Sequence, residues 1–121
     1  RKAVKGEENP VAEPELIRKM ATNQLAEDIG SLLPEGPEGF REWMPFEGLG
    51  MGLGVWVAQD SSRLAWNSNP GEFGWGGIAN TVFWIDPVSD SSVLFFTQVM
   101  PSSQLGLRVA LHRFAAEILH R

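Results

Sequence analysis

The stretch that decides the fold lies in the second half of the chain, where residues 71–87 have the sequence GEFGWGGIANTVFWIDP. It holds four glycines and two tryptophans, and it leads directly into an apolar run. Glycine weakens a strand, so its presence there indicates that a ligand or another backbone approaches closely. The sequence therefore predicts a buried strand next to an uncovered stretch of backbone.

The segments around this stretch have the composition of strands joined by turns. The continuous apolar run at 81–85 predicts a strand covered on both faces, and residues 92–99 predict its returning partner, also covered on both faces. The residues from Asp86 to Asp90 have the composition of a hairpin connection. A further short strand is expected at 63–67. Together these segments predict an antiparallel sheet.

A second glycine-rich segment precedes this region, where Gly48, Gly50, Gly52 and Gly54 alternate with aliphatic residues. Alternate residues of a strand share a face, so a strand over 48–60 would have one face of bare backbone. Four glycines would cost a helix roughly 3–4 kcal/mol relative to alanine. The spacing fits neither a phosphate-binding P-loop nor a dinucleotide fingerprint. We therefore expect a strand whose glycine face lets another element approach closely.

Apolar residues at helical spacing predict one helix before the strands in the sequence and one after them. Pro14 suits a first helical turn, and the pattern after it predicts a helix over 14–24. A second helix is predicted near the C-terminus by an apolar stripe of Leu107, Leu111, Phe114, Ala115 and Ile118. The predicted fold class is therefore α+β, an antiparallel sheet flanked by N- and C-terminal helices. These helices are too short to cover both faces of the sheet, so the sequence anticipates a layer that it does not contain.

Composition excludes several classes of function. The chain has 121 residues, a net charge of −5 and no cysteine. The acidic balance argues against a nucleic-acid partner, and no apolar run approaches the ~20 residues of a membrane span. Thiolate metal sites are excluded, and we expect neither a metal nor a cofactor. Residues 1–13 are polar and predict a flexible linker, with the folded portion at 14–121.

The titratable residues form no complete catalytic constellation. His112 and His120 lie in the predicted C-terminal helix, eight residues apart, which is about 12 Å along the axis and too far to share a metal. Both are interpreted as solvated histidines near a helix C-terminus, where positive charge is favoured. No Gly-x-Ser-x-Gly motif is present.

An ordered set of short motifs carries the strongest functional indication. In chain order these are M-x-x-N-Q-L at 20–25, the alternating glycines, W-G-G at 75–77, D-P at 86–87, V-L-F-F-T-Q at 93–98 and the terminal helix. The set resembles the C-terminal portion of the serine β-lactamase and penicillin-binding protein superfamily, over roughly residues 14–119. The class C-like branch, which includes esterases of the β-lactamase fold, is the part of the superfamily that it resembles most.

The resemblance implies a serine acyl-transfer enzyme with a Ser-x-x-Lys nucleophile motif and a tyrosine that assists as base. It places Trp75, Gly76 and Gly77 at the substrate-binding third motif, where lactamases have Lys-Thr-Gly. The backbone N–H of Ile78 would then be one of two oxyanion-hole donors, the other belonging to the nucleophilic serine. Trp75 in place of lysine removes a positive charge, which favours a small, uncharged ester or amide substrate over a β-lactam.

The catalytic residues of that superfamily are absent from this sequence. No serine is followed three residues later by lysine, and the chain has no tyrosine. The resemblance therefore implies an N-terminal catalytic portion as partner, in a separate chain or a missing segment, and no hydrolysis by this chain alone. An uncovered apolar sheet face would also favour homo-oligomers. The alternative is a non-catalytic interaction module that binds a peptide along a glycine-rich edge strand.

Overall fold

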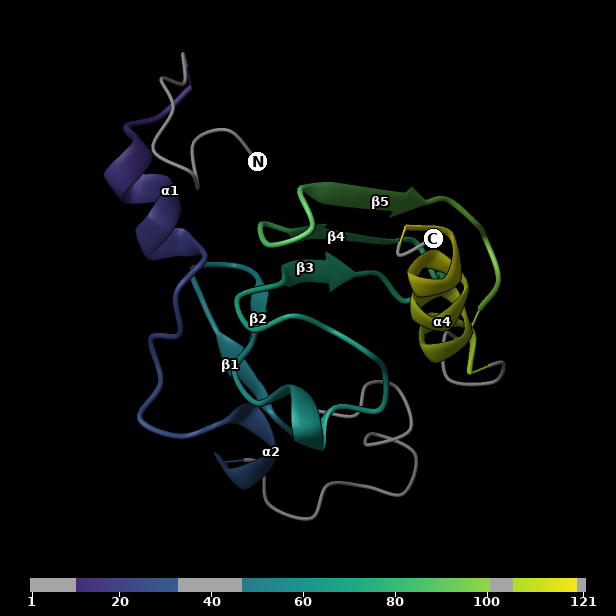
Figure 1. Cartoon of the computed structure of the whole chain (residues 1–121), viewed down its shortest axis with the longest axis horizontal. Coiled ribbons are helices and arrows are strands. Elements are labelled where there is room, and N and C mark those ends of the chain that lie inside the picture. Colours follow the sequence, from purple (N-terminus) through teal and green to yellow (C-terminus); the bar gives the residue numbers. More distant parts are fainter. Residues whose placement is uncertain (1–10, 33–46, 101–105, 120–121) are drawn as a thin grey trace.

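A computed structural model describes residues 11–32, 47–100 and 106–119. Its elements are, in chain order, α1 (Pro14–Met20), α2 (Ile29–Leu32), β1 (Leu49–Met51), β2 (Trp56–Ala58), the 3-10 helix η2 (Ser61–Arg63), β3 (Phe73–Gly76), β4 (Val82–Asp86), β5 (Ser91–Phe95) and α4 (Leu107–Leu119). Figure 1 shows α4 beside the strands and α2 near β1. Most of the linker predicted at 1–13 lies outside the described residues, as does His120.

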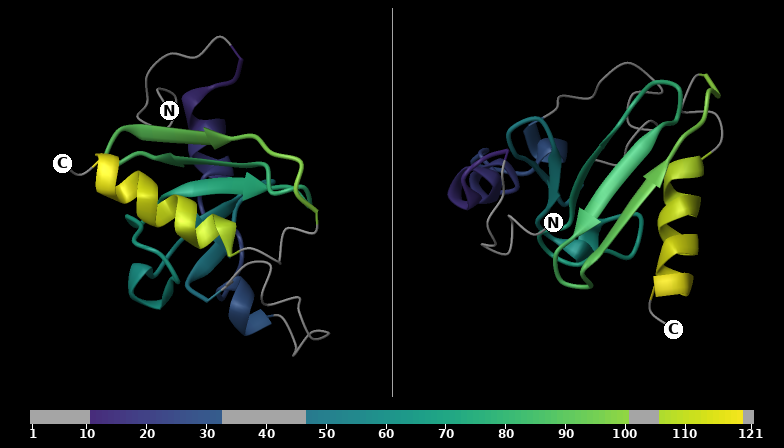
Figure 2. Two further views of the ribbon diagram at one scale, coloured as in Figure 1. Left: turned by 90° about the vertical axis from the view of Figure 1, so that its right-hand side faces the viewer. Right: turned by 90° about the horizontal axis from the view of Figure 1, so that it is seen from above.

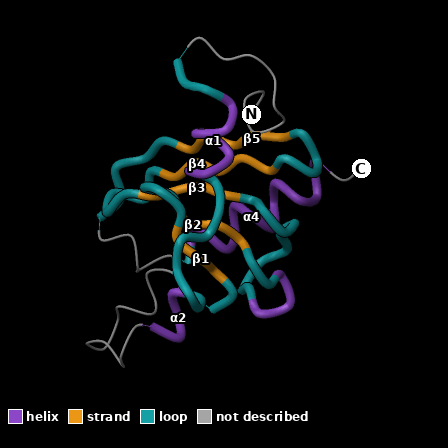
Figure 3. Tube along the Cα trace, turned by 90° about the vertical axis from the view of Figure 1, so that its left-hand side faces the viewer, coloured by secondary structure: helices purple, strands orange, loops and turns teal. Residues whose placement is uncertain are grey.

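The five strands form one antiparallel sheet in which neighbours in sequence are neighbours in space, in the order β1-β2-β3-β4-β5. Figure 3 shows the strands following one another in this order. The register places Trp84 of β4 between Gly74 of β3 and Val93 of β5. The predicted α+β class, an antiparallel sheet with helices before and after it, is therefore confirmed.

The side chain of Asp86 explains why the chain turns between β4 and β5. Its carboxylate accepts hydrogen bonds from the backbone N–H groups of Val88 and Ser89, at 2.8 and 3.3 Å, and from the Ser89 hydroxyl at 2.6 Å. The Asn69 amide donates a further bond of 2.7 Å. Burial alone would raise the pKa of Asp86, but these hydrogen bonds outweigh it and hold the pKa below its usual value. The hairpin predicted at 86–90 is confirmed.

The single strand predicted over 48–60 is wrong, because the chain reverses direction in its middle. The N–H of Gly52 donates to the carbonyl of Val55 at 2.8 Å, and Gly54 adopts a φ of +83°. Glycine enters this left-handed region without the steric cost that a Cβ imposes. The alternating glycines therefore lie in a hairpin whose two arms are β1 and β2.

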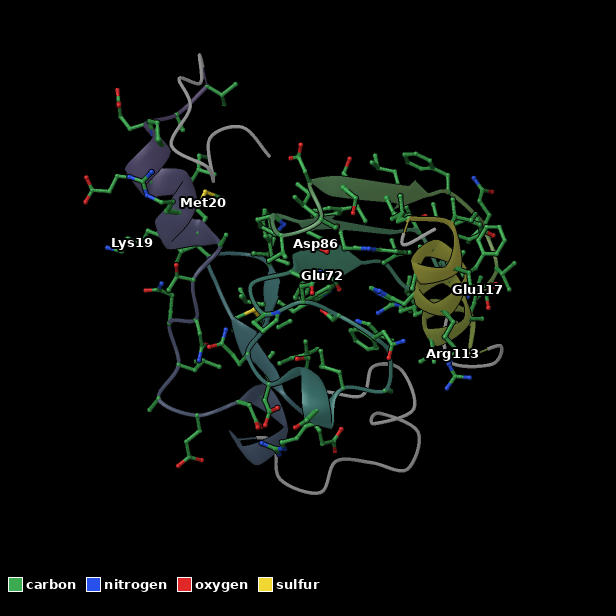
Figure 4. The ribbon with its side chains drawn as sticks, in the orientation of Figure 1. Lys19, Met20, Glu72, Asp86, Arg113 and Glu117 are labelled. Atoms are coloured by element: carbon green, nitrogen blue, oxygen red, sulfur yellow. The ribbon has the colours of Figure 1, made fainter. Side chains whose placement is uncertain are left out.

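The close approach expected at these glycines is confirmed, and the approaching element is the segment 20–24. A Cβ on Gly50 would lie 2.8 Å from Cβ of Asn23, and one on Gly52 would overlap the carbonyl oxygen of Met20. Met20 lies at the end of α1 that is nearer to the sheet (Figure 4). Backbone hydrogen bonds also join this segment to the end of β1. It therefore covers the outer side of β1.

The helix predicted over 14–24 ends at Met20, because Asn23 and Gln24 bond to Met51 of β1. The Met20 carbonyl itself accepts a hydrogen bond from Leu53 in the hairpin loop. α1 and α4 lie on opposite sides of the sheet (Figure 2). α1 has no buried residue, so it contributes little to the core. None of the helices among the described residues could span a membrane.

The main hydrophobic cluster consists of Ile29, Leu49, Trp56, Ala58, Trp66, Val82 and Trp84. Its partly buried neighbours include Val109, Leu111 and Ala115 of α4, so α4 covers this face of the sheet. On β5, the side chains alternate between partly buried and exposed, and Leu94 is 64% exposed. The prediction that this strand is covered on both faces is therefore wrong for the described residues.

The strand predicted at 63–67 is also wrong. The carboxylate of Asp60 accepts hydrogen bonds from the backbone N–H and the hydroxyl of Ser62, at 3.0 and 2.6 Å. This capping favours the short 3-10 helix η2 over an extended chain. Residues 64–66 then bend so that the indole of Trp66 enters the core, where it is 5% exposed.

Candidate functional site

The end of β3 and the loop after it carry the residues of the third motif: Trp75 and Gly76 end the strand, and Gly77 and Ile78 begin the loop. Gly77 N–H donates to the Thr81 carbonyl at 2.8 Å, and Asn80 N–H donates to the Gly77 carbonyl at 3.2 Å. Asn80 has a φ of +63°. This bonding is typical of a three-residue hairpin loop that ends on a residue in the left-handed region. Asparagine suits that position because its short polar side chain makes the conformation less costly.

Side chains of the same loop tie it to the segment after β5. Asn80 is completely buried, and its side-chain amide donates to the carbonyl of Val99 at 3.1 Å. The hydroxyl of Thr81 donates to the carbonyl of Thr97 at 3.2 Å. The loop conformation is therefore fixed from two sides, by its own backbone and by the neighbouring segment.

The backbone N–H of Ile78 donates to no acceptor in the part of the chain that the structure describes. The Ile78 side chain is 51% exposed, so the residue lies at the surface. Beside it, a Cβ added to Gly77 would have the Thr81 carbonyl oxygen as its nearest neighbour, at 3.9 Å. An amide donor thus stands next to open space on a fixed loop.

β3 lies in the middle of the sheet, so its backbone is open only near its end. β2 pairs with Phe73 and Gly74 of β3 and does not extend alongside the later residues of that strand. The backbone of Trp75 and Gly76 is therefore paired with β4 alone. A ligand that adds to the sheet edge would meet a short open edge here, between the end of β2 and the loop.

The glycines of β3 make room mainly for other parts of the protein. A Cβ on Gly74 would overlap the Phe83 carbonyl oxygen and lie 2.9 Å from Cα of Trp84. A Cβ on Gly76 would lie 2.7 Å from the guanidinium carbon of Arg108. The close approach that the sequence predicts near this strand is thus made by Trp84 and Arg108, and the space beside Gly77 remains open.

An apolar groove lies on the face of the sheet that points away from α4. Trp75 points to this face because it alternates with Gly74 and Gly76, which face the buried side. The groove has a volume of about 300 Å³, and its lining residues are Trp75, Gly76, Gly77, Thr81, Val82, Phe83, Leu94 and Phe96. The groove therefore runs from the third-motif glycines to the exposed side chains of Leu94, in β5, and Phe96, directly after it.

A buried polar cluster that the sequence pattern does not predict lies on the other face of the sheet. His112 of α4 is 4% exposed and stacks between Trp84 and Trp66, with ring centroids 3.9 and 4.5 Å away. Its Nδ1 lies 3.6 Å from Oε1 of Glu72, which also accepts a hydrogen bond of 3.3 Å from the Trp66 indole. The interpretation of His112 as a solvated histidine is therefore wrong.

The buried face of α4 differs from the apolar stripe that the sequence predicts. The predicted stripe includes Phe114 and Ile118, but both are more than half exposed. The face that packs on the sheet contains His112 and Ala115. A histidine on the buried face has no signature in the local sequence, since its partners come from other elements.

Burial raises the pKa of Glu72 to about 7 and lowers the pKa of His112 to about 3. The proton therefore resides on the Glu72 carboxyl, and both groups are uncharged in mildly acidic solution. Figure 4 shows Glu72 among the strands, beside Asp86. This cluster lies on the α4 side of the sheet, across the strands from the groove at Trp75. Among the described residues, no three His, Asp or Glu side chains gather in a way that could hold a metal ion.

Comparison with solved structures gives the fold its context. EstCE1, a hydrolase with promiscuous acyltransferase activity, superposes with a TM-score of 0.65 and 21% identity over 95% of this chain. Unliganded simvastatin synthase (LovD) from Aspergillus terreus superposes with a TM-score of 0.66 and 22% sequence identity over 92% of this chain. For the LovD9 mutant of that enzyme, the TM-score is 0.65 and the sequence identity is 24% over 89% of this chain.

This chain has the C-terminal part of a β-lactamase-like fold. The resemblance to the serine β-lactamase superfamily is thus confirmed for the fold. The chain spans only 26–31% of the length of the three solved structures. No protein-family profile and no curated protein sequence matches it.

Proposed function

We propose that this chain is the C-terminal part of an esterase-type serine hydrolase and that it supplies one oxyanion-hole donor, the backbone N–H of Ile78. The observation that carries the proposal is the open position of this amide, on a fixed loop beside the uncovered Gly77. The nucleophilic serine would come from a Ser-x-x-Lys motif in an N-terminal portion. The similarity in fold to hydrolases and acyltransferases supports the same assignment.

The chemistry of acyl transfer requires such a donor. When a serine attacks an ester carbonyl, the carbonyl oxygen gains negative charge, and a preorganised N–H stabilises that charge. Removing one donor of this kind reduces kcat by about 10²- to 10³-fold in a serine protease. Gly77 has no side chain to block the approach of the oxygen to Ile78, so the substrate could reach the amide from the open side.

The groove beside the amide favours an uncharged acyl group. Its lining contains no charged residue, and tryptophan and phenylalanine side chains form much of its surface. An apolar acyl group would bury these rings, whereas a carboxylate would be desolvated there without a charged partner. We therefore propose Trp75, Gly76 and Gly77 as substrate-binding residues and a small, uncharged ester or amide as the substrate.

The exposed apolar side chains at the far end of the groove support an N-terminal partner. Leu94 is 64% exposed and Phe96 is 77% exposed. Apolar patches of this kind mark surfaces that another protein element covers. We propose that the N-terminal catalytic portion covers this face of the sheet and places its serine near Ile78.

The alternative function, peptide binding along a glycine-rich edge strand, has less support. The edge in question is β1, and the segment 20–24 already occupies its outer side through hydrogen bonds such as that from Gln24 N–H to the Met51 carbonyl at 2.8 Å. An added peptide would have to displace this segment. β3, the other glycine-rich strand, is paired on both sides over its first half.

Complementation tests the proposed function. This chain would be combined with the Ser-x-x-Lys-bearing portion of the same protein, and hydrolysis of nitrophenyl esters would be followed. We expect activity from the combination, and we expect Gly77→Phe to abolish it by filling the space beside the amide. Val88→Phe is the control, since Val88 is 67% exposed in the β4–β5 turn. No hydrolysis from a folded complex, or full activity of Gly77→Phe, would overturn the proposal.

A further inference from the structure

An arginine on α4 binds the same peptide unit that carries the proposed donor. Nη2 of Arg108 donates a hydrogen bond of 2.9 Å to the carbonyl oxygen of Gly77. That oxygen also accepts the N–H of Asn80 at 3.2 Å. The Gly77 carbonyl is therefore held by two donors, one from the helix and one from its own loop.

The geometry of a peptide bond transmits this hold to Ile78. The Gly77 carbonyl and the Ile78 N–H belong to one planar unit, and in a trans peptide the two groups point in opposite directions. Fixing the carbonyl toward Arg108 therefore fixes the N–H in the direction away from that side chain. A cation at the oxygen also polarises the amide, because hydrogen bonds in series strengthen one another.

Arg108 lies where a cation is unfavourable unless it has a partner. It is the second residue of α4, close to the positive end of the helix dipole. Burial lowers its pKa, and its Nε is buried with no hydrogen-bond partner among the described residues. Among the described residues, the hydrogen bond to the Gly77 carbonyl offsets these costs, since charge-assisted hydrogen bonds are the stronger kind.

Gly76 provides the space that this arrangement requires. A Cβ there would lie 2.7 Å from Cζ and 2.8 Å from Nη2 of Arg108. The absence of a side chain at the middle position of the Trp-Gly-Gly motif therefore admits the guanidinium to the Gly77 carbonyl. This accounts for a glycine that substrate approach alone does not explain, since Gly76 faces the α4 side.

We infer that Arg108 is a positioning residue for the oxyanion hole: it orients and polarises the Gly77–Ile78 peptide so that the Ile78 N–H is ready to bind the developing oxyanion. The inference rests on the proposed function. It gives Arg108 of α4 a role in the reaction, and it gives Gly76 a second role beside the substrate binding proposed above.

The first arm of the test measures the hydrogen bond in this chain alone. The carbonyl ¹³C shift of Gly77 and the amide ¹⁵N and ¹H shifts of Ile78 would be compared between the wild type and Arg108→Met. We expect all three to change with Arg108→Met, and to remain near the wild-type values with Arg113→Met. Arg113 lies on the same helix and is exposed, as Figure 4 shows. Unchanged shifts in Arg108→Met would overturn the inference.

The second arm measures turnover in the complex with the Ser-x-x-Lys-bearing portion. We expect Arg108→Met to lower kcat roughly 10- to 100-fold, which is a smaller decrease than removal of an oxyanion-hole donor causes. KM should stay within about twofold of the wild-type value. Arg108→Lys should retain part of the activity, and guanidinium ion should partly rescue Arg108→Ala. Gly76→Ala, which displaces the guanidinium without removing it, should lower kcat in the same way.

The outcomes separate the two proposals. If the wild-type complex hydrolyses no ester, the proposed function fails and the inference fails with it. If the wild type is active and both Arg108→Met and Gly76→Ala keep the wild-type kcat, only the inference is overturned. Equal losses in kcat for Arg108→Met and Arg113→Met would also overturn it, because a general effect on α4 would then explain the result.

Discussion

His112 stacks on Trp84 with the ring centroids 3.9 Å apart and the ring planes inclined by 23°. The imidazole also stacks on Trp66. The histidine of α4 is therefore held by two tryptophans, one from β4 and one from the segment before β3. This stack fixes α4 on the sheet. Since Arg108 is on the same helix, the stack also sets the position from which the guanidinium reaches Gly77.

The first prediction concerns Glu72, which lies 3.6 Å from His112. Its pKa is raised by burial from 4.5 to about 7, so the folded state keeps a proton that the unfolded chain releases in this window. This contribution to the free energy of unfolding is present below pH 4.5 and is lost as the pH rises through 7. His112, with its pKa lowered by burial from 6.5 to about 3, has the opposite effect, and its contribution is lost as the pH falls from 6.5 to 3.

The two contributions nearly cancel between pH 4.5 and 6.5 in the wild type, which should show a flat profile there. In Glu72→Gln only His112 remains, so the free energy of unfolding should rise with pH in this interval, by up to about 1.4 kcal/mol per unit. In His112→Phe, which keeps an aromatic ring in the stack, it should fall with pH. Urea unfolding at several pH values measures both slopes, and slopes of the same sign would contradict the assignment.

The second prediction compares two glycines three residues apart. In Gly74→Ala, the new methyl group would overlap the Phe83 carbonyl oxygen and contact Cα of Trp84 at 2.9 Å. Both are backbone atoms of the paired strand, so relief requires β3 and β4 to separate. We expect a loss of about 3 kcal/mol. Gly77→Ala, with its nearest neighbour at 3.9 Å, should change stability by under about 1 kcal/mol. Equal unfolding midpoints for the two variants would contradict this packing.

The third prediction concerns the loop that carries Ile78. Asn80→Ala keeps a φ of +63° with a residue type that adopts this conformation less readily than asparagine, and it removes the bond to Val99. These losses sum to about 2–3 kcal/mol. Asn80→Gly keeps the conformation and loses only the bond, so it should be the more stable of the two variants. Thermal unfolding decides the order, and a more stable Asn80→Ala would show that the backbone conformation is not the constraint.

Local patterns predicted the elements whose partners follow directly in the sequence. The apolar run and the Asp86 turn identified β4 and β5, because a hairpin needs only neighbouring segments. Helical spacing likewise identified α4. The order of motifs then led to the correct fold, although no single motif would have been sufficient.

Features that depend on a particular backbone conformation or on distant partners were not predictable from the sequence pattern. The reversal at Gly54 requires a positive φ that glycine permits but does not enforce. His112 is buried because Trp66 and Trp84 surround it, and periodicity contains no information about them. Arg108 lies 31 positions from Gly77, so no local sequence pattern indicates that the two residues meet.

The last prediction tests the face opposite α4, where Leu94 and Phe96 are 64% and 77% exposed. In the double variant Leu94→Glu/Phe96→Glu, two carboxylates would be placed on an apolar surface. Because both side chains are largely in solvent, the stability of this chain alone should change by under about 1 kcal/mol. The affinity for the Ser-x-x-Lys-bearing portion should fall at least about tenfold, since burying these charges without partners is costly.

Isothermal titration of this chain with that portion measures the affinity, and ester hydrolysis provides a second readout. Val88→Glu is the matched control, because Val88 is 67% exposed on the β4–β5 turn and does not line the groove. It should bind as the wild type does. If the double variant binds with unchanged affinity, the partner does not cover this face. The groove at Trp75 would then be open to solvent in the complex, and the placement of a serine beside Ile78 would lose its structural basis.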